Sequence, residues 1–255
     1  MKRFGLIGHP IAHSLSPALF KAGYDGRYPY ELIETPDFEE AYQRFIEGYD
    51  GINVTAPFKE DAFKKADILS DECRKIGATN LLVKTPEGIK AYNSDYLGVR
   101  MWLEETLSCL SNEGHIKVLV VGLGGAGKAA AAAAESLGMT VTKMNRTVKD
   151  ENTLPLDDFR KYFRESDIII YNIPAAIPAL NELSDADFTP GKPKFILEAN
   201  YKNPSFDKVM TERMSAANTS LYYTGGRTWL LYQAVTGYEI FTGEKPDFTK
   251  MTDVL

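Results

Sequence analysis

A lysine near the end of a short apolar run is the residue of this sequence best placed for proton transfer. Lys59 closes the segment GINVTAPFK, residues 51–59, whose apolar run leads into a helix predicted to begin at Pro57. Lys59 then lies in the first helical turn, where the helix dipole disfavours a cation by about 0.3–1 kcal/mol. A lysine in that position is suited to exchanging a proton near neutral pH. The alternative interpretation is a solvated surface lysine, whose charge Glu60 and Asp61 offset.

A carboxylate is available to act with that lysine. Asp95 follows a short apolar run, in the sequence YNSD at residues 92–95. A carboxylate near an ammonium group can orient it or share its proton. Asp95 could also cap a helix beginning near Tyr96, and the two roles are compatible. Asn80 supplies an amide beside the neighbouring apolar run.

Three glycines predict a dinucleotide site. Gly122, Gly124 and Gly127 form the pattern G-x-G-x-x-G between the strongest predicted strand, 117–121, and an alanine-rich predicted helix. The first glycine permits a tight turn, the second lets the backbone approach a pyrophosphate, and the third allows close helix–strand packing. Free N–H groups at the helix start can then hold the phosphates. A glycine-rich turn without a ligand is the alternative.

The end of the next predicted strand favours NADP over NAD. An NAD-selective site usually has Asp or Glu about 20 residues after the glycine turn, where it binds the ribose 2′-hydroxyl. Here Asn145 stands in that place, followed by Arg146, Thr147 and Lys149. These side chains can hydrogen-bond a 2′-phosphate or offset its charge. A solvated loop arginine is the alternative interpretation of Arg146.

Two serines and a glutamine complete the candidate polar residues. Ser14 and Ser16 would lie on one side of an extended segment, where their hydroxyls could hold a carboxylate without burying a charge. Ser16 could instead be a helix N-cap, with Pro17 at the first helical position. Gln233 is a lone polar residue on the last predicted helix, and most such glutamines are simply exposed.

The elements that must position these residues alternate between apolar runs and helical patterns, which is typical of α/β architecture. The predicted strands are 4–7, 30–34, 52–55, 80–84, 88–92, 117–121, 140–144, 168–171, 195–198 and 221–223. The predicted helices are 16–24, 38–48, 61–70, 96–110, the alanine-rich helix after the glycine turn, and 229–241, with a turn at 111–114. A change of character near residue 100 predicts two lobes: residues 1–97 with 226–255, and residues 98–225.

Composition narrows the class of protein. The chain has 255 residues, 44% of them hydrophobic and 25% charged, as in ordinary globular proteins. A net charge of −6 argues against nucleic-acid binding. The absence of a signal-like start and of an apolar run of about 18 residues predicts a cytoplasmic protein that does not bind a membrane. Cys73 and Cys109 are predicted to be buried free thiols, and no metal site is expected.

Taken together, these segments resemble the shikimate dehydrogenase family almost end to end. Several independent motifs occur in the family's order, which is more specific than any one of them. The segments that carry the resemblance are residues 8–17, 53–59, 77–80 and 93–95, the glycine turn, residues 145–147, and residues 226–234.

The resemblance implies a two-lobed α/β fold. One lobe would be a substrate-binding domain, the other a Rossmann-like NADP-binding domain, and the active site would lie in the cleft between them. The implied activity is the reversible, NADP-dependent reduction of 3-dehydroshikimate to shikimate in aromatic amino-acid (chorismate) biosynthesis. Whether the protein is a monomer or a homodimer stays open.

The resemblance also implies a role for each candidate residue. Lys59 and Asp95 would act at the carbonyl group that is reduced. The substrate carboxylate would be held by Ser14 and Ser16, and the remainder of the substrate by Thr55, Asn80, Tyr201 and Gln233. The cofactor would contact Gly122, Gly124, Gly125, Ala126, Asn145, Arg146, Thr147 and Lys149.

The sequence departs from the family pattern at a few positions. Ser94 replaces a usual threonine and Trp229 a usual methionine, which stands near the expected nicotinamide. Glu198 replaces a usual aspartate, and the segment after Tyr201 has one extra residue before its proline. Asp150 stands where a second phosphate-binding arginine is common, a loss that Lys149 could offset.

Two other functions are compatible with the sequence. The first is a quinate/shikimate dehydrogenase that uses NAD or NADP. The second is a non-catalytic protein that senses a nucleotide or metabolite. Retention of both Lys59 and Asp95 favours an enzyme, because a protein that only binds needs neither.

Overall fold

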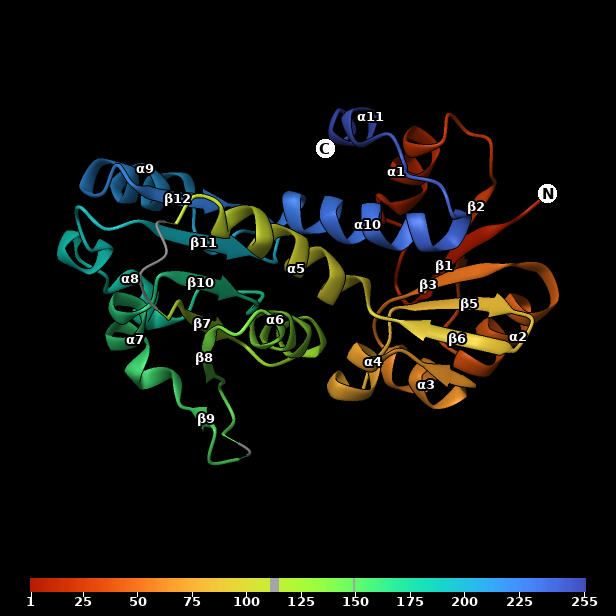
Figure 1. Cartoon of the computed structure of the whole chain (residues 1–255), viewed down its shortest axis with the longest axis horizontal. Helices are drawn as coiled ribbons and strands as arrows, with labels where there is room; N and C mark the ends of the chain where they lie inside the picture. The colour runs from red at the N-terminus through yellow and green to blue at the C-terminus, as the bar shows by residue number, and fades with distance from the viewer. Residues whose placement is uncertain (111–114, 149) are drawn as a thin grey trace. The chain divides into compact units, whose positions relative to one another are not determined.

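The computed structural model describes residues 1–110, 115–148 and 150–255. The chain divides into two compact units, Met1–Gly98 with Leu231–Leu255, and Val99–Leu230. Each unit contains one six-stranded sheet (Figure 1). The predicted turn at 111–114 lies outside the described residues, so the structure does not test it.

The sheet of the first unit has the strand order β2-β1-β3-β5-β6-β4. Its strands are β1 (Phe4–Gly8), β2 (Tyr30–Glu34), β3 (Gly51–Val54), β4 (Ile68–Leu69), β5 (Leu81–Thr85) and β6 (Gly88–Tyr92). Its helices are α1 (Ser16–Gly23), α2 (Phe38–Gly48), α3 (Lys59–Lys65), α4 (Asp71–Ile76) and α11 (Phe248–Thr252). The boundary between the units falls within α5 (Ser94–Leu107) and α10 (Gly226–Thr242).

The strand directions of this sheet bring distant segments to one edge. β1 pairs in parallel with β2 and β3, whereas β5 runs antiparallel to both β3 and β6. The carboxyl ends of β1, β3 and β6 and the amino end of β5 therefore share an edge. The predicted hairpin is confirmed as β5 and β6. The helix predicted over 61–70 is wrong at its end, because Ile68 and Leu69 pair with Lys90 and Ala91 of β6.

Both faces of this sheet are covered. Helices α2, α3 and α4 pack on one face, where Phe45, Ala62 and Cys73 join the strand residues Ile7 and Ile52 in one apolar core. Helices α1 and α10 cover the other face, on the opposite side of the strands in Figure 1. The core on that side is aromatic, and its rings contact one another; they include those of Phe4, Phe20, Tyr238 and Phe241.

The sheet of the second unit is parallel throughout, in the order β12-β11-β10-β7-β8-β9. Its strands are β7 (Lys117–Val121), β8 (Thr140–Met144), β9 (Thr153–Leu154), β10 (Ile168–Tyr171), β11 (Lys194–Glu198) and β12 (Leu221–Thr224). Its helices are α6 (Gly125–Ser136), α7 (Phe159–Glu165), α8 (Pro178–Asn181) and α9 (Lys208–Ala217), with the short 3₁₀ turns η1 (Leu156–Asp158) and η2 (Asp185–Phe188).

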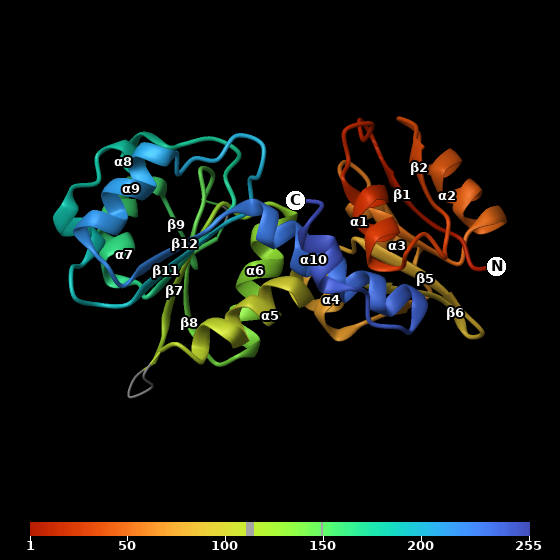
Figure 2. The ribbon, with the colours of Figure 1, turned by 90° about the horizontal axis from the view of Figure 1, so that it is seen from above.

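Helices cover both faces of this parallel sheet, as its continuous apolar strands require. Helix α6 lies on one face, and α7 and α9 lie on the other (Figure 2). The predicted strands 117–121, 140–144 and 168–171 are confirmed with the same bounds. Helices α7, α8 and α9 were not predicted, because their short amphipathic patterns are weak in the sequence.

Two composition-based expectations can be compared with the structure. Cys73 is buried, and burial raises the pKa of its thiol to about 11. The prediction for Cys109 is wrong: this thiol is exposed, because the residue lies past the end of α5. Among the helices formed by described residues, none is long and apolar enough to cross a membrane.

Candidate active site

The candidate substrate residues gather where the strand order of the first sheet reverses. The chain runs outward from β1 to β2 on one side and from β3 to the remaining strands on the other. Ligands of open α/β sheets bind outside the carboxyl ends of strands at such a point. Ser14 and Ser16 follow β1, and Thr55 and Lys59 follow β3. Asn80 precedes the antiparallel β5, so it reaches the same edge.

Lys59 and Asp95 form a close ion pair. The Lys59 Nζ lies 2.6 Å from Asp95 Oδ2, and the two side chains are 24% and 10% exposed. Asp95 lies in the first turn of α5, where the helix dipole stabilises a carboxylate. Lys59 lies in the first turn of α3, where the dipole opposes a cation. The carboxylate thus holds an ammonium group at a place that the backbone alone would not favour.

Two local predictions around this pair are wrong in detail. Helix α3 begins at Lys59, two residues after Pro57, because residues 55–58 form a turn closed by a hydrogen bond from Phe58 N to Thr55 O (3.0 Å). Helix α5 is capped by Asn93, whose Oδ1 accepts from Tyr96 N at 3.1 Å. Asp95 is therefore released from capping, and its carboxylate is available to Lys59.

The two serines lie together, although for a different reason from the one predicted. Ser14 Oγ donates to Ser16 Oγ at 3.1 Å, and Ser16 N donates to Ser14 Oγ at 3.2 Å. The segment between them is turned rather than extended, since Leu15 has helical φ and ψ and is the N-cap of α1. Ser16 is thus the first residue of the helix, and Pro17 follows it. Both hydroxyls are half-buried or buried at the edge of the sheet.

A buried polar network joins three of the elements at this edge. Ser94 N and Ser94 Oγ donate to Asn80 Oδ1 at 2.7 and 3.3 Å, and the same hydroxyl donates to Gln233 Oε1 at 3.0 Å. Gln233, expected to be exposed on sequence grounds alone, is half-buried. Thr55 is tied to β1 through Thr55 N and Ile7 O (3.0 Å). The structure therefore brings Asn80 and Gln233 together through Ser94, whose role the sequence did not reveal.

The glycine turn of the second unit has the form that a phosphate ligand requires. Gly122 adopts a φ of +88°, and a Cβ on Gly127 would overlap the carbonyl oxygen of Gly122. Gly124 is the N-cap of α6, and Gly124 and Gly125 are exposed. The first N–H groups of α6 therefore face open space at the positive end of the helix dipole, as an anion site needs.

A second feature beside this turn fits a dinucleotide. The strand order reverses between β7 and β10, which places the glycine turn and Asn172 at a switch point. Asn172 Nδ2 donates to Ile170 O at 3.3 Å, whereas its buried Oδ1 lacks a hydrogen-bond partner among the described residues. A buried acceptor without a donor is costly unless a ligand or water supplies one. The glycine turn and the buried Asn172 Oδ1 together fit a dinucleotide.

The residues predicted to select NADP follow β8. Asn145 Oδ1 accepts from Leu123 N at 3.4 Å, so its amide braces the glycine turn. Asn145 Nδ2 donates to Thr147 O at 3.2 Å, which shapes the loop that carries Arg146. Arg146 and Thr147 are exposed. Lys149 lies outside the described residues, and its predicted role is not tested.

Tyr201 belongs to the second unit, in the loop after β11. A buried carboxylate shapes that loop: Glu198 accepts hydrogen bonds from Ser205 N, Phe206 N and Tyr223 Oη at 2.5, 3.4 and 2.6 Å. Burial and the neighbouring carboxylate raise the pKa of Tyr223, so its hydroxyl remains a donor. Trp229, on α10, is 7% exposed. The predicted substrate contact of Tyr201 stays a prediction.

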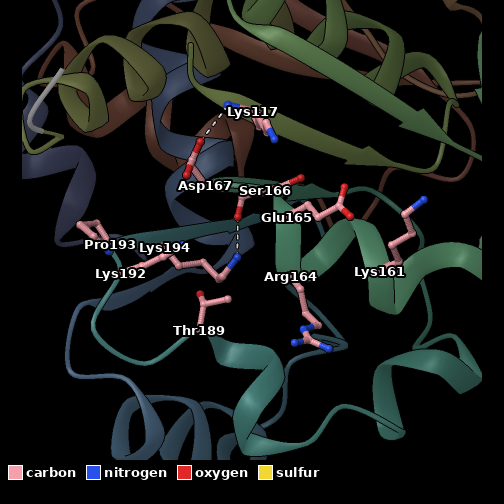
Figure 3. Close-up of a pocket in the computed structure, with 10 residues that line it drawn as sticks. All are labelled: Lys117, Lys161, Arg164, Glu165, Ser166, Asp167, Thr189, Lys192, Pro193 and Lys194. Atoms are coloured by element: carbon pink, nitrogen blue, oxygen red, sulfur yellow. Dashed lines mark hydrogen bonds between the residues drawn. The ribbon is translucent and has the colours of Figure 1, made fainter. Parts of the chain in front are cut away.

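A pocket of about 550 Å³ lies at the opposite edge of the second sheet, where β7, β10 and β11 begin (Figure 3). Several basic residues line this pocket. The most buried of them, Lys194, makes contacts that belong to the fold. Lys194 Nζ donates to Phe163 O (2.8 Å) and to Ser166 O, so it closes the carboxyl end of α7. Burial lowers the pKa of Lys194 to about 8. Arg164 is engaged with Asp187 at 3.6 Å. Lys194 and Arg164 thus both have partners within the fold.

Comparison with known proteins agrees with the geometry of both sheets. A family model for the shikimate dehydrogenase substrate-binding domain matches residues 6–82. A model for the NAD-binding domain of D-isomer-specific 2-hydroxyacid dehydrogenases matches residues 81–197. The chain is 30% identical over 267 aligned residues to a shikimate dehydrogenase (NADP(+)) of Caldicellulosiruptor saccharolyticus, covering 94% of this chain and 92% of the relative.

Solved structures show the same fold. The crystal structure of shikimate 5-dehydrogenase from Thermus thermophilus in complex with NADP(H) and shikimate matches with a TM-score of 0.80 and 26% identity, covering 100% of this chain and 98% of that chain. A quinate dehydrogenase from Corynebacterium glutamicum in complex with NAD shares the fold at a TM-score of 0.80 and 22% identity, covering 99% and 98% of the two chains. The chain belongs to the shikimate dehydrogenase family, as an oxidoreductase with an N-terminal substrate-binding domain and a parallel, Rossmann-like NAD(P)-binding domain.

Proposed function

We propose that this protein catalyses the reversible, NADP-dependent reduction of 3-dehydroshikimate to shikimate in aromatic amino-acid biosynthesis. The observation that carries the proposal is the Lys59–Asp95 pair, 2.6 Å apart at the switch point of the first sheet. An ammonium group held by a carboxylate can donate a proton, and a protein that only binds its ligand would not need such a donor. The names of the C. saccharolyticus and T. thermophilus relatives support the same substrate and cofactor.

The proposed chemistry assigns proton transfer to Lys59. Bound NADPH supplies a hydride to the carbonyl carbon of the substrate. Negative charge then grows on the carbonyl oxygen, where the Lys59 ammonium stabilises it and donates a proton. Asp95 keeps that ammonium in place through the short ion pair. In the reverse direction, the neutral Lys59 amine accepts the hydroxyl proton.

The remaining residues of the first sheet edge would bind the substrate. We assign the substrate carboxylate to the paired hydroxyls of Ser14 and Ser16. The Ser16 hydroxyl would donate to it directly, and the Ser14 hydroxyl would donate by turning away from Ser16, with no competing buried charge. Thr55, Asn80 and Gln233 would hold the ring hydroxyls. Tyr201 of the second unit is proposed as a further substrate contact.

The glycine turn would hold the cofactor phosphates. The N–H groups of Gly125 and Ala126, at the start of α6, are suited to the pyrophosphate. The exposed Arg146 and Thr147 are suited to a 2′-phosphate, which is the basis for proposing NADP over NAD. Asn145 would act by bracing the turn, and Lys149 would add a second positive charge.

The test is to follow the reduction of NADP⁺ and NAD⁺ by the purified protein with shikimate and, separately, with quinate. We expect rapid, shikimate-dependent reduction of NADP⁺, with slower turnover of NAD⁺ and of quinate. Faster turnover with quinate or NAD⁺ would replace the substrate or cofactor proposed here. A folded protein that binds shikimate in a calorimeter but turns over none of these pairs would instead favour a metabolite-sensing function.

A further inference from the structure

Helices α5 and α10 cross in the first unit at two reciprocal glycine contacts. A Cβ on Gly98 would lie 2.5 Å from the backbone nitrogen of Gln233. A Cβ on Gly237 would lie 3.1 Å from the Cβ of Ser94. Ser94 and Gly98 are one turn apart on α5, as Gln233 and Gly237 are on α10. The crossing therefore brings Ser94 and Gln233 face to face, because Gly98 lies against the backbone of α10 and Gly237 against the Ser94 side chain.

The hydrogen bonds of Ser94 orient one carboxamide unambiguously. The backbone N–H of Ser94 can only donate, so its partner at 2.7 Å must be the carbonyl end of the Asn80 side chain. The Asn80 backbone is itself fixed between β3 and β6, by Val54 N to Asn80 O (2.8 Å) and Asn80 N to Tyr92 O (3.3 Å). The Nδ2 group is therefore the end of Asn80 that is turned away from Ser94.

The hydroxyl of Ser94 orients a second carboxamide in the same sense. Ser94 Oγ is fully buried and donates to Gln233 Oε1 at 3.0 Å, which turns the Gln233 Nε2 group away from the serine. The longer contact of 3.3 Å to Asn80 Oδ1 is secondary, because a hydroxyl has one hydrogen. Two carboxamides on different elements thus share one serine at their carbonyl ends.

We propose that Ser94 is a positioning residue that presents the N–H₂ groups of Asn80 and Gln233 to the substrate as a matched pair of donors. The inference rests on the proposed function, since it assumes that these two amides contact substrate hydroxyls. Those hydroxyls then accept hydrogen bonds from the amides. Because the two N–H₂ groups can only donate, they bind a substrate hydroxyl oxygen, which has lone pairs to accept with. A protonated amine at the same ring position has no lone pair and is rejected.

The first test compares Ser94→Ala with Ser94→Thr and with a matched control. Thr106→Val removes another buried hydroxyl of α5, one that donates only to Trp102 O among its described contacts (2.8 Å). We expect Ser94→Ala to lower kcat/KM for shikimate about 10- to 100-fold, mainly through KM, with KM for NADP⁺ unchanged. Ser94→Thr keeps a hydroxyl and should restore most of the loss. Equal kinetics for Ser94→Ala and Thr106→Val would overturn the proposal.

A double-mutant cycle tests whether Ser94 acts through the glutamine. If it does, Ser94→Ala should cost much less in the Gln233→Ala background than in the wild type, because the group that it orients is already gone. Full additivity of the two losses would show that Ser94 does not act through Gln233. Proper folding of each variant is checked by its thermal unfolding.

A third measurement separates this inference from the proposed function. The side-chain N–H₂ signals of Asn80 and Gln233 in the ligand-free protein report how rigid each carboxamide is, whatever the substrate. We expect both carboxamides to be rigid in the wild type and in Thr106→Val. In Ser94→Ala the Gln233 carboxamide should become mobile, because it loses the hydroxyl, whereas Asn80 should stay rigid, because alanine keeps the backbone N–H that holds it. A rigid Gln233 carboxamide in Ser94→Ala would overturn the positioning role of the hydroxyl even in an active enzyme. A mobile Gln233 carboxamide in a protein inactive with shikimate would sustain that role and reject only the substrate.

Discussion

Two lysines, one in each unit, stand at opposite ends of helices. Lys59 lies in the first turn of α3, where the dipole opposes its charge, and its ammonium is held by Asp95 at 2.6 Å. Lys194 closes the carboxyl end of α7, where the dipole favours a cation, and its Nζ is bound by two backbone carbonyls. The first side chain is 24% exposed, whereas Lys194 is 1% exposed.

Under the proposed function, Lys59 takes part in the chemistry, whereas the contacts of Lys194 stabilise the fold. Lys59 reaches a sheet edge at a switch point and has a partner that a substrate oxygen can join. Lys194 has two backbone carbonyls as acceptors at the end of α7, and its burial lowers its pKa to about 8. The proposal for Lys59 rests on its position at the sheet edge and on its contact with Asp95.

Removing Lys59 is the most direct test of the difference between the two lysines. We expect Lys59→Ala to lower kcat for shikimate oxidation about 1,000-fold, because the proton acceptor is lost, with only a modest rise in KM. Steady-state kinetics with NADP⁺ measures the change. Unchanged turnover in this variant would remove Lys59 from the mechanism and with it the functional half of the comparison.

The pH dependence of stability should single out Lys194. Below about pH 8 the folded and unfolded states both hold the Lys194 proton, so this group adds no pH dependence. Between about pH 8 and 10.5 the unfolded state keeps a proton that the folded state has released, so stability rises with pH, by about 3 kcal/mol in all. Urea unfolding of the wild type and of Lys194→Met, compared from pH 7 to 11, isolates this change. A constant difference between the two would contradict it.

Replacing the partner of Lys59 tests the ion pair itself. Asp95→Asn keeps the size and one acceptor oxygen but removes the charge that holds the ammonium. We expect kcat to fall about 100-fold and the fall to be smaller than in Lys59→Ala. A larger loss than in Lys59→Ala would make Asp95, rather than Lys59, the principal proton carrier.

The smallest expected effect is the loss of stability on removing Lys194 at pH 7. Lys194→Met leaves the carbonyls of Phe163 and Ser166 without this donor but also removes a buried charge. The unpaired carbonyls lower the free energy of unfolding and the removal of the buried charge raises it, so the net loss of stability should be about 1 kcal/mol. Turnover should match that of the wild type below the unfolding temperature. Loss of activity in a folded Lys194→Met protein would erase the distinction between the two lysines.

The sequence predicts most of the regular elements and much of the chemistry. Continuous apolar strands such as 117–121 and the glycine turn that follows need only local residues to be identified. Pairings between distant segments are harder to predict: β4 is a strand only because Ile68 and Leu69 meet β6. The start of α3 was misplaced for a similar reason, since Pro57 belongs to a turn closed on Thr55.

Parts of the candidate site depend on contacts that sequence spacing does not encode. The role of Ser94 appears only when α5 and α10 cross, since Gln233 is distant from it in the chain. Asn172 becomes notable only because its Oδ1 is buried beside the glycine turn. The residue types alone were enough to identify candidate site residues. Which of them lie close together became clear only from the order of the strands in the sheet.

The glycine crossing of α5 and α10 has a thermal consequence. Backbone atoms in contact have no rotamers to populate, so the spacing of the two helices at Gly98 cannot loosen one side chain at a time. Warming should therefore leave the distance between Ser94 and Gln233 nearly constant until the first unit melts as a whole. Substrate selectivity would then stay constant as the temperature rises. It would be lost abruptly, over the same narrow temperature range in which the first unit unfolds.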